Sequence, residues 1–342
     1  MTTSEQGPMP FGHLPDGRVV ESVRIGRGPL RAEILTYGAV IRDLRFDGHG
    51  PPLVLGLNGM EDYVLHSRNF GASPGRCANR IAGGRFVLDG KAYELERNEP
   101  GGRNHIHGGS TGMARSLWAI TGLTHDRVEL SIRDPDGNAG FPGTVEVTCT
   151  ITASETGVLS MRYESRCDAP CPVNLCHHGY FNLGHRLDVL DHTVRIAAEA
   201  YLPVNDVKIP LGVPQAVAGT PFDLRTETPL GDRLLQLEGG FDHNFCLSAD
   251  RQALRPIAWI SAPDGLQMEV ATTEPGVQFF TAPTLTCLVP GLDGRRYGPA
   301  AGLCLETQIW PDAINQHGFP DVVLRPGQRR VQETEYRFSW PA

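Results

Sequence analysis

The sequence predicts an all-β protein, a many-stranded antiparallel sandwich. Apolar and polar residues alternate with a period of two in several segments, which is the pattern of a strand with one buried face. Turn signals separate these segments. Helical periodicity is weak along the whole chain, and the short stretch 230–237 is the best helical candidate. Together these observations favour a large antiparallel sandwich.

The clearest strands follow one another through the middle of the chain. The alternation predicts half-buried strands at 128–132, 145–151, 159–163 and 194–198. Short runs that favour turns are Asp89-Gly90, Asp136-Gly137-Asn138, Thr156-Gly157 and Pro263-Asp264-Gly265. We expect these turns to separate successive strands.

We expect a single domain. The chain has 342 residues, of which 40 are Gly and 27 are Pro, and no linker, charge block or internal repeat divides it. All-β domains can be this long, so the length does not require a second unit. The predicted domain covers residues 10–342, and residues 1–9 are expected to form a flexible N-terminus.

Charge and hydropathy exclude two classes of partner. The net charge is −8 and no run of Lys or Arg exceeds two residues, so we expect no nucleic-acid surface. No stretch approaches the ~18 apolar residues of a membrane span, so we expect no membrane partner. Residues 1–7 lack the features of a signal peptide, and the chain is therefore expected to be cytoplasmic.

The eight cysteines predict free thiols. None forms a C-x-x-C pair, and several lie inside apolar runs, as Cys149 does in residues 147–151. We interpret them as reduced, buried thiols rather than as disulfides or metal ligands.

One carboxylate stands in a stretch that otherwise has the composition of a buried strand. Residues 302–310 form a short apolar run that carries Glu306, and Pro311 then ends the strand. A buried, unpaired carboxylate is costly or becomes protonated, and a raised pKa suits a general base near neutral pH. We interpret Glu306 as functional and Asp312, which follows the break, as a turn or capping residue.

Two Gly-rich clusters carry a guanidinium and two imidazoles. Arg80 lies beside the glycines of residues 79–86, where it suits sugar hydroxyls or a carboxylate, although a solvated surface turn is the alternative. His105 and His107 would share one face of a strand, but no third ligand follows nearby, so we expect no metal. The preferred interpretation of His107 is a hydrogen-bond donor held on a Gly loop.

His177 and His178 are adjacent, so on an extended strand they face opposite sides and only one can enter a given pocket. Histidine is the natural acid near neutral pH, although a core histidine bonded to the backbone is the alternative. Asp242, between two aromatic residues, is either a turn residue or an acceptor for substrate hydroxyls. Either Gln278 or Phe279 would face a pocket.

Motifs for cofactors and for one class of hydrolase are missing. No G-x-G-x-x-G follows a strand, and no phosphate loop of the form G-x-x-x-x-G-K-[ST] is present. Residues 71–75 match the G-x-S-x-G elbow of hydrolases, but Pro74 lacks the N–H that the oxyanion hole of this elbow uses. We therefore reject the elbow.

Five motifs in order resemble the aldose 1-epimerase (galactose mutarotase) family over roughly residues 10–340. They are Asn79-Arg80-Ile81, His107-Gly108-Gly109, residues 173–183 with His178 and Tyr180, Phe241-Asp242-His243-Asn244-Phe245, and Leu305-Glu306-Thr307-Gln308 followed by residues 311–315. The resemblance implies a large antiparallel β-supersandwich of the galactose mutarotase type. It also implies interconversion of the α and β anomers of a free monosaccharide, with no metal and no cofactor.

The resemblance further implies residue roles. By it, Glu306 is the general base, His178 is the general acid and His107 is the second histidine of the pocket. The implied substrate contacts are Asn79, Arg80, Tyr180, Asp242 and Gln278. The chain departs from the commoner family pattern at Cys176-His177, Gly179, His105-Ile106 and Trp310. We expect these positions to touch pocket walls and to affect the choice of sugar, which stays open between galactose, glucose, arabinose and rarer sugars.

Three other functions fit parts of the pattern. A non-catalytic carbohydrate-binding protein would use the same sandwich but would not need a Glu and a His in one pocket. A glycoside hydrolase would pair Glu306 with Asp242, which leaves the histidines without a role. A hexose-6-phosphate 1-epimerase of related fold should show extra basic residues around the pocket, and the matched motifs contain only Arg80.

Overall fold

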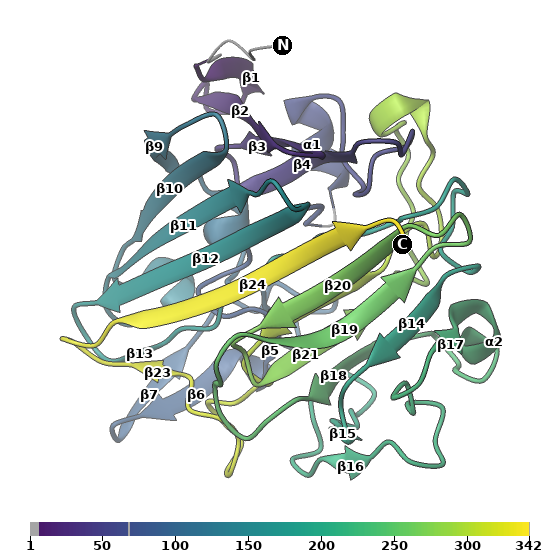
Figure 1. Cartoon of the computed structure of the whole chain (residues 1–342). Coiled ribbons are helices and arrows are strands. Elements are labelled where there is room, and N and C mark those ends of the chain that lie inside the picture. Colours follow the sequence, from purple (N-terminus) through teal and green to yellow (C-terminus); the bar gives the residue numbers. More distant parts are fainter. Residues whose placement is uncertain (1–6, 68, 342) are drawn as a thin grey trace.

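The structure, a computed structural model, describes residues 7–67 and 69–341. The ladders between named strands in these residues are antiparallel, and Figure 1 shows the long strands of the largest sheet side by side. Most of the predicted flexible segment 1–9 lies outside the described residues. Met9, which is described, begins the first strand and pairs with Ser22.

The largest sheet has nine strands within the described residues. In order across the sheet they are β17 (Thr228–Pro229), β14 (Thr193–Ile196), β19 (Arg255–Ser261), β20 (Gln267–Thr272), β24 (Arg330–Ser339), β12 (Val158–Cys167), β11 (Val145–Ala153), β10 (Arg127–Asp134) and β9 (Ala119–Leu123). The four strands predicted from alternation are β10, β11, β12 and β14, which confirms them, except that Ala198 lies beyond the end of β14.

Two smaller sheets complete the main architecture. The four-stranded sheet consists of β1 (Met9–His13), β2 (Val19–Arg27), β3 (Leu30–Leu35) and β4 (Val40–Phe46). The five-stranded sheet has the order β16 (Gln215–Ala216), β15 (Ala200–Tyr201), β18 (Asp242–Cys246), β21 (Gly276–Phe280) and β22 (Cys304–Gln308). Two-stranded ladders join β5 (Arg80–Ile81) to β8 (His105–Ile106), β6 (Arg85–Leu88) to β7 (Lys91–Glu94) and β13 (Cys171–Pro172) to β23 (Val323–Leu324).

Helix is scarce in the part of the chain that the structure describes. The α-helices are α1 (Met60–His66) and α2 (Leu230–Leu234), and short 3-10 turns occur at Ala82–Gly84, Met113–Arg115, Asn138–Gly140 and Leu292–Gly294. The helical candidate 230–237 is α2, which is shorter than predicted. No helix within the described residues is long and apolar enough to cross a lipid bilayer.

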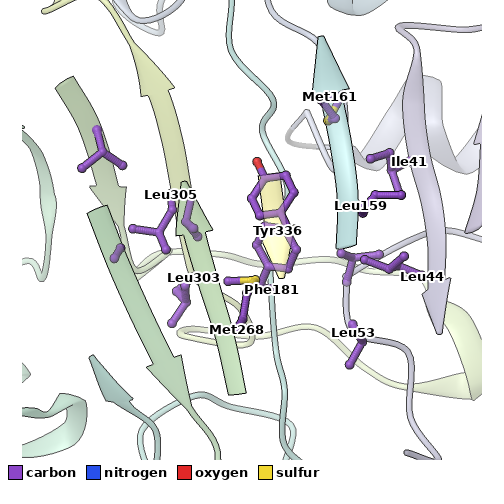
Figure 2. Packing of buried hydrophobic residues seen from close by; sticks show 14 of the residues in the cluster. Ile41, Leu44, Leu53, Leu159, Met161, Phe181, Met268, Leu303, Leu305 and Tyr336 are labelled. Atoms are coloured by element: carbon purple, nitrogen blue, oxygen red, sulfur yellow. The ribbon is translucent and has the colours of Figure 1, made fainter. Parts of the chain in front are cut away.

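One apolar cluster connects the three main sheets. Figure 2 shows Tyr336 of the nine-stranded sheet between Leu305 of the five-stranded sheet and Ile41 of the four-stranded sheet. Because such a shared core excludes water from facing sheet surfaces, it stabilises their stacking. This continuity supports the proposal of one domain over residues 10–342.

The cysteines lie mostly in the interior. All eight are free thiols, and Cys77, Cys149, Cys171, Cys176 and Cys304 are buried while the other three are partly buried. The prediction of free thiols inside the protein is confirmed. Two of them, Cys176 and Cys304, lie beside the polar cluster described next.

Candidate active site

Strand β22 carries Glu306 on the face opposite the apolar core. Leu305 packs into the core, and the hydroxyl of Thr307 lies 2.6 Å from that of Thr334 on β24. Since side chains alternate along a strand, Glu306 faces the other way, together with Cys304. Gln278 on β21 pairs directly with Glu306, so their side chains share that face.

Glu306 is almost completely removed from solvent, with 2% of its surface exposed. Burial raises the pKa of Glu306 to about 8, and the negative charge of Asp242 adds to the rise. The thiol of Cys176 donates a hydrogen bond to Oε2 at 3.4 Å and, together with the positive charge of Arg80, opposes that rise. The carboxylate is therefore poised to exchange its proton near neutral pH.

His178 faces Glu306 from a different segment of the chain. Its Nε2 lies 3.5 Å from Oε1 of Glu306, and its ring stacks on Tyr180 with centroids 4.9 Å apart. Burial lowers the pKa of His178 to about 4, so the free protein holds a neutral imidazole at pH 7. His177 points to the opposite side, with Nδ1 3.0 Å from the Tyr336 hydroxyl, and the predicted opposition of the two rings is confirmed.

His107 closes the third side of this cluster. It has a left-handed backbone (φ 52°), and its N–H donates to the carbonyl of Asn79 at 3.0 Å. Its Nδ1 accepts a hydrogen bond from the Asn79 N–H at 3.2 Å, which places the ring proton on Nε2. The His107 and His178 rings meet edge to face with centroids 5.3 Å apart. Burial lowers the pKa of His107 well below its usual value, so it remains a neutral donor.

The loop of His107 explains its glycine. A Cβ on Gly108 would lie 1.8 Å from the carbonyl oxygen of Gly75, so only glycine permits this approach. His105 does not share the face of His107, because the left-handed turn at His107 follows the end of β8. His105 instead places Nδ1 2.7 Å from the Glu96 carbonyl oxygen.

The polar rim of the cluster consists of an interlocked group of side chains. Gln278 Nε2 donates to Asp242 Oδ1 at 2.7 Å, and Arg80 Nη1 lies 3.8 Å from Asp242 Oδ2. Arg80 Nε also donates to Glu99 at 2.6 Å, and the Arg80 side chain is only 13% exposed. The alternative of a solvated surface turn is thus wrong for Arg80. Asn79 accepts a hydrogen bond from the Arg80 N–H at 2.9 Å.

Asp312 supports the loop of Arg80. Its N–H donates to the Arg80 carbonyl at 3.1 Å, and its carboxylate accepts hydrogen bonds from the Ala82 N–H at 2.9 Å and the Asn315 amide at 2.7 Å. The interpretation of Asp312 as a turn residue is confirmed.

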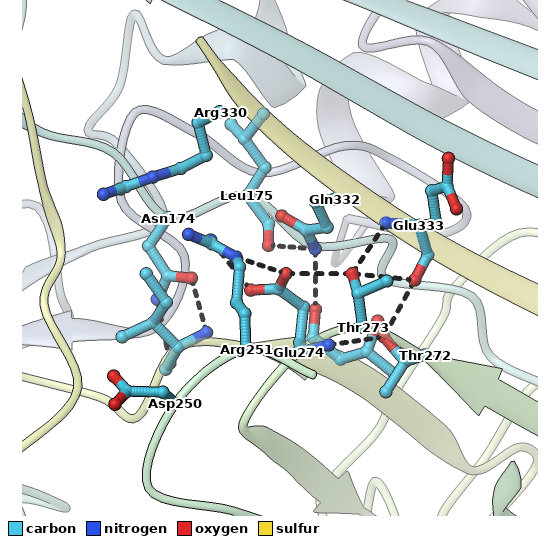
Figure 3. A network of polar contacts seen from close by, with 12 residues as sticks. Asn174, Leu175, Asp250, Arg251, Thr272, Thr273, Glu274, Arg330, Gln332 and Glu333 are labelled. Carbon is cyan, nitrogen blue, oxygen red and sulfur yellow. Dashed lines mark hydrogen bonds and ion pairs between the residues drawn. The ribbon is translucent and has the colours of Figure 1, made fainter. Parts of the chain in front are cut away.

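Buried amide side chains tie the segment of His178 to β22. Gln332 Nε2 donates to the carbonyl of Leu175 at 2.9 Å, as Figure 3 shows, and to the carbonyl of Thr307 at 3.0 Å. Asn174 exchanges two hydrogen bonds with the backbone of Ile309. The segment that carries His178 is therefore fixed against the strand that carries Glu306.

The network of Figure 3 extends to the turn before β21. Arg251 forms a two-point ion pair with the buried Glu274 at 2.7 and 2.9 Å. Gln332 was not predicted from the sequence. The signal that could have identified it is a polar residue at a core-facing position of the alternating strand β24.

The departures from the family pattern occupy different places from those expected. Of these positions, Cys176 contacts the carboxylate of Glu306 itself. His105 and His177 turn away from the cluster, so the expectation that they touch pocket walls is wrong, because their rings bond to Glu96 and to the core residue Tyr336. The indole N–H of Trp310 donates to the Pro275 carbonyl at 2.9 Å.

Comparison with known proteins decides the family. The family model described as aldose 1-epimerase matches residues 21–337. The chain belongs to the aldose 1-epimerase family. It is 42% identical over 337 residues to a protein named galactose mutarotase from Rattus norvegicus, covering 96% of this chain and 97% of the relative. It is 33% identical to the aldose 1-epimerase of Escherichia coli (strain K12), covering 95% and 96%.

Solved structures of aldose 1-epimerase relatives share the fold. A GalM/aldose epimerase homologue from C. elegans superposes with a TM-score of 0.86 at 27% identity, covering 94% of this chain and 100% of that one. The galactose 1-epimerase of Lactobacillus acidophilus NCFM gives a TM-score of 0.84 at 26% identity, covering 98% and 99%. The predicted supersandwich of the galactose mutarotase type is confirmed.

Proposed function

We propose that this isomerase of the aldose 1-epimerase family interconverts the α and β anomers of a free aldose, with Glu306 as general base and His178 as general acid. The observation that carries the proposal is the buried pair itself. Oε1 of Glu306 lies 3.5 Å from Nε2 of His178, and burial moves the two pKa values in opposite directions. Between these two pKa values the pair holds one proton, which rests on Glu306 in the free protein. The reactive form has this proton on His178 and leaves Glu306 ionised.

The reaction needs one proton removed and one supplied. Glu306 takes the proton of the C1 hydroxyl while His178 gives a proton to the ring oxygen, so the C1–O5 bond breaks and the open aldehyde forms. Rotation about C1–C2 and the reverse proton transfers close the ring on the other face. Each positioned acid or base contributes about 10²–10⁴-fold to the rate.

His107 assists at the ring oxygen. Since Nδ1 of His107 accepts the Asn79 N–H, the remaining Nε2–H is the group free to donate. A neutral donor beside His178 stabilises developing negative charge on the ring oxygen without adding a second proton to the reaction.

The sugar hydroxyls are held by the polar rim, namely Asn79, Arg80, Tyr180, Asp242 and Gln278. Gln278 Oε1 is buried and makes no hydrogen bond within the described residues, although its amide nitrogen is bonded to Asp242. Because an unpaired buried acceptor is costly, a sugar hydroxyl at this place would stabilise the complex. Asp242 offers carboxylate oxygens to the same end of the pocket.

A phosphorylated sugar is the less favoured substrate. Arg80, the cation of the matched motifs, already contacts the carboxylates of Glu99 and Asp242. A phosphate placed there would meet both negative charges as well as the guanidinium. The proposed partner is therefore an unphosphorylated monosaccharide.

The proposed location is the cytoplasm. Eight thiols without a disulfide among them suit a reducing compartment.

Anomer exchange measured by NMR across galactose, glucose, arabinose and the hexose 6-phosphates tests the proposal. We expect catalysed exchange of at least one free aldose and much slower exchange of the 6-phosphates, and a chelator in every sample should leave the rates unchanged. Tight sugar binding without exchange would instead identify a carbohydrate-binding protein. Release of nitrophenol from aryl glycosides would identify a hydrolase.

A further inference from the structure

A second cluster of two imidazoles and one carboxylate lies in loops that the acid–base site does not use. His49 follows β4, His185 belongs to the segment between β13 and β14, and Asp264 occupies the turn between β19 and β20. The ligand-type atoms of these three side chains all lie within 4.8 Å of one another. The cluster shares no residue with the group of His107, His178 and Glu306.

The spacing of the cluster matches a tetrahedral metal. Asp264 Oδ2 lies 3.4 Å from Nδ1 of His49 and 3.2 Å from Nε2 of His185. Zinc binds such atoms at ~2.0–2.1 Å, which places neighbouring ligands of a tetrahedron about 3.3 Å apart. Both Asp264 separations agree with this value, and the two imidazole nitrogens lie within 4.8 Å of each other.

The ring nitrogens of the buried member of the cluster, His49, lack hydrogen-bond partners in the part of the chain that the structure describes. The side chain of His49 is 0% exposed, yet neither ring nitrogen makes a hydrogen bond within the described residues. Buried polar atoms without a partner are costly, and each one calls for an explanation such as an ion. Burial also lowers the pKa of His49, which favours the neutral form that binds metals.

The loops present the three side chains in usable orientations. The Oδ1 atom of Asp264 accepts the Leu266 N–H at 3.2 Å, which leaves Oδ2 directed at the two rings. The His49 and His185 rings lie 5.2 Å apart. Arg295 donates hydrogen bonds to the carbonyls of His185 and Arg186 and so fixes the His185 loop. A cation bound in the cluster would lie near the positive charge of Arg295.

We propose that His49, His185 and Asp264 form a zinc site with a fourth position open to water. The His185 side chain is 64% exposed, so an ion can reach the site from solvent. Two histidines, a carboxylate and a water are a ligand set that zinc commonly takes. The ion would link three loops that are far apart in the sequence and would thereby stabilise this end of the sandwich.

Calorimetric titration with zinc chloride, after dialysis against a chelator and then against metal-free buffer, tests the site. We expect the wild type to bind one zinc ion per chain. In His185→Ala the affinity for zinc should fall by more than roughly 10–100-fold, which is the cost of removing an outer-shell partner of a metal ligand. His125→Ala is the matched control, because His125 is also exposed and lies 3.8 Å from one carboxylate but has no second imidazole in its group.

The acid–base group must be separated from this result. His107, His178 and Glu306 also offer atoms within 4.8 Å of one another, so the titration is repeated in Glu306→Gln. Loss of the zinc ion in His185→Ala but not in Glu306→Gln supports the loop site. A cobalt(II) sample should show tetrahedral absorption bands, and zinc should raise the melting temperature of the wild type but not of His185→Ala. Equal zinc binding by the wild type and His185→Ala, or no binding at all, would overturn the proposal.

Discussion

Removal of the Cys176 thiol should slow mutarotation and move its alkaline limit to higher pH. This thiol donates to Oε2 of Glu306 at 3.4 Å and so favours the charged carboxylate. Hydrogen bonds to charged groups contribute about 1.5–3 kcal/mol, and a weak sulfur donor at this distance falls below that range, at about 1 kcal/mol. With 1.36 kcal/mol per pKa unit, Cys176→Ala should raise the pKa of Glu306 by about 0.5–1 unit.

The assay is the pH profile of kcat/KM, which reports the essential groups of the free enzyme. Burial raises the pKa of Glu306 to about 8 and lowers that of His178 to about 4, so the pair keeps the one proton that the reaction needs between these values, and activity falls as the pH rises through about 8. At a pH below the transition, Cys176→Ala should be about 3–10-fold slower than the wild type, the ratio that the expected pKa shift implies.

A hydroxyl in place of the thiol provides the matched control. Cys176→Ser retains a donor and should keep the transition near or below its wild-type position. An unshifted transition in Cys176→Ala, or one displaced to lower pH, would refute the role assigned to the thiol. A melting temperature for each variant separates this effect from a loss of folding.

Three further predictions concern the same cluster. Asp242→Asn removes a negative charge that raises the pKa of Glu306, so the transition near pH 8 should move to lower pH while KM for the sugar rises, as steady-state kinetics would show. An unmoved transition would count against this coupling. Gln332→Leu leaves the carbonyls of Leu175 and Thr307 without the amide that donates to them, so urea unfolding should show a loss of about 1–3 kcal/mol in the free energy of unfolding. In the same variant kcat should change more than KM. Full stability would contradict the positioning role. Because the pKa of Glu306 is raised in the folded protein, wild-type stability should fall as the pH rises from about 4.5 to about 8. Across this window the stability of Glu306→Gln relative to the wild type should therefore increase with pH in urea unfolding. Parallel pH profiles of the two proteins would refute this prediction.

Alternation along the strands was sufficient to predict much of the fold. The strands β10, β11 and β12 follow one another and pair in sequence order, so their half-buried pattern and turns locate them. Strand β24 pairs with β12 and β20 instead. Its alternation indicates a strand but does not say which distant segments it pairs with. The helix α1 was missed because seven residues with only Met60 and Tyr63 buried give too short a helical pattern.

The site was predictable where burial and charge conflict within one segment. Glu306 on an apolar strand, and the opposite directions of His177 and His178, are local properties of the sequence. The contact of Cys176 with Glu306 joins segments 130 residues apart, so no local pattern contains it. The direction of His105 depended on the left-handed turn at His107, which a polar-apolar pattern does not encode.

The exchange rate of the sugar anomers in Glu306→Gln tests the central claim most directly. Glutamine keeps the volume of the side chain but cannot accept the C1 proton. NMR exchange spectroscopy should show anomerisation slower by about 10²–10⁴-fold, the usual contribution of a positioned base, while the sugar still binds with similar affinity. Exchange at nearly the wild-type rate would contradict the assignment of Glu306 as the base.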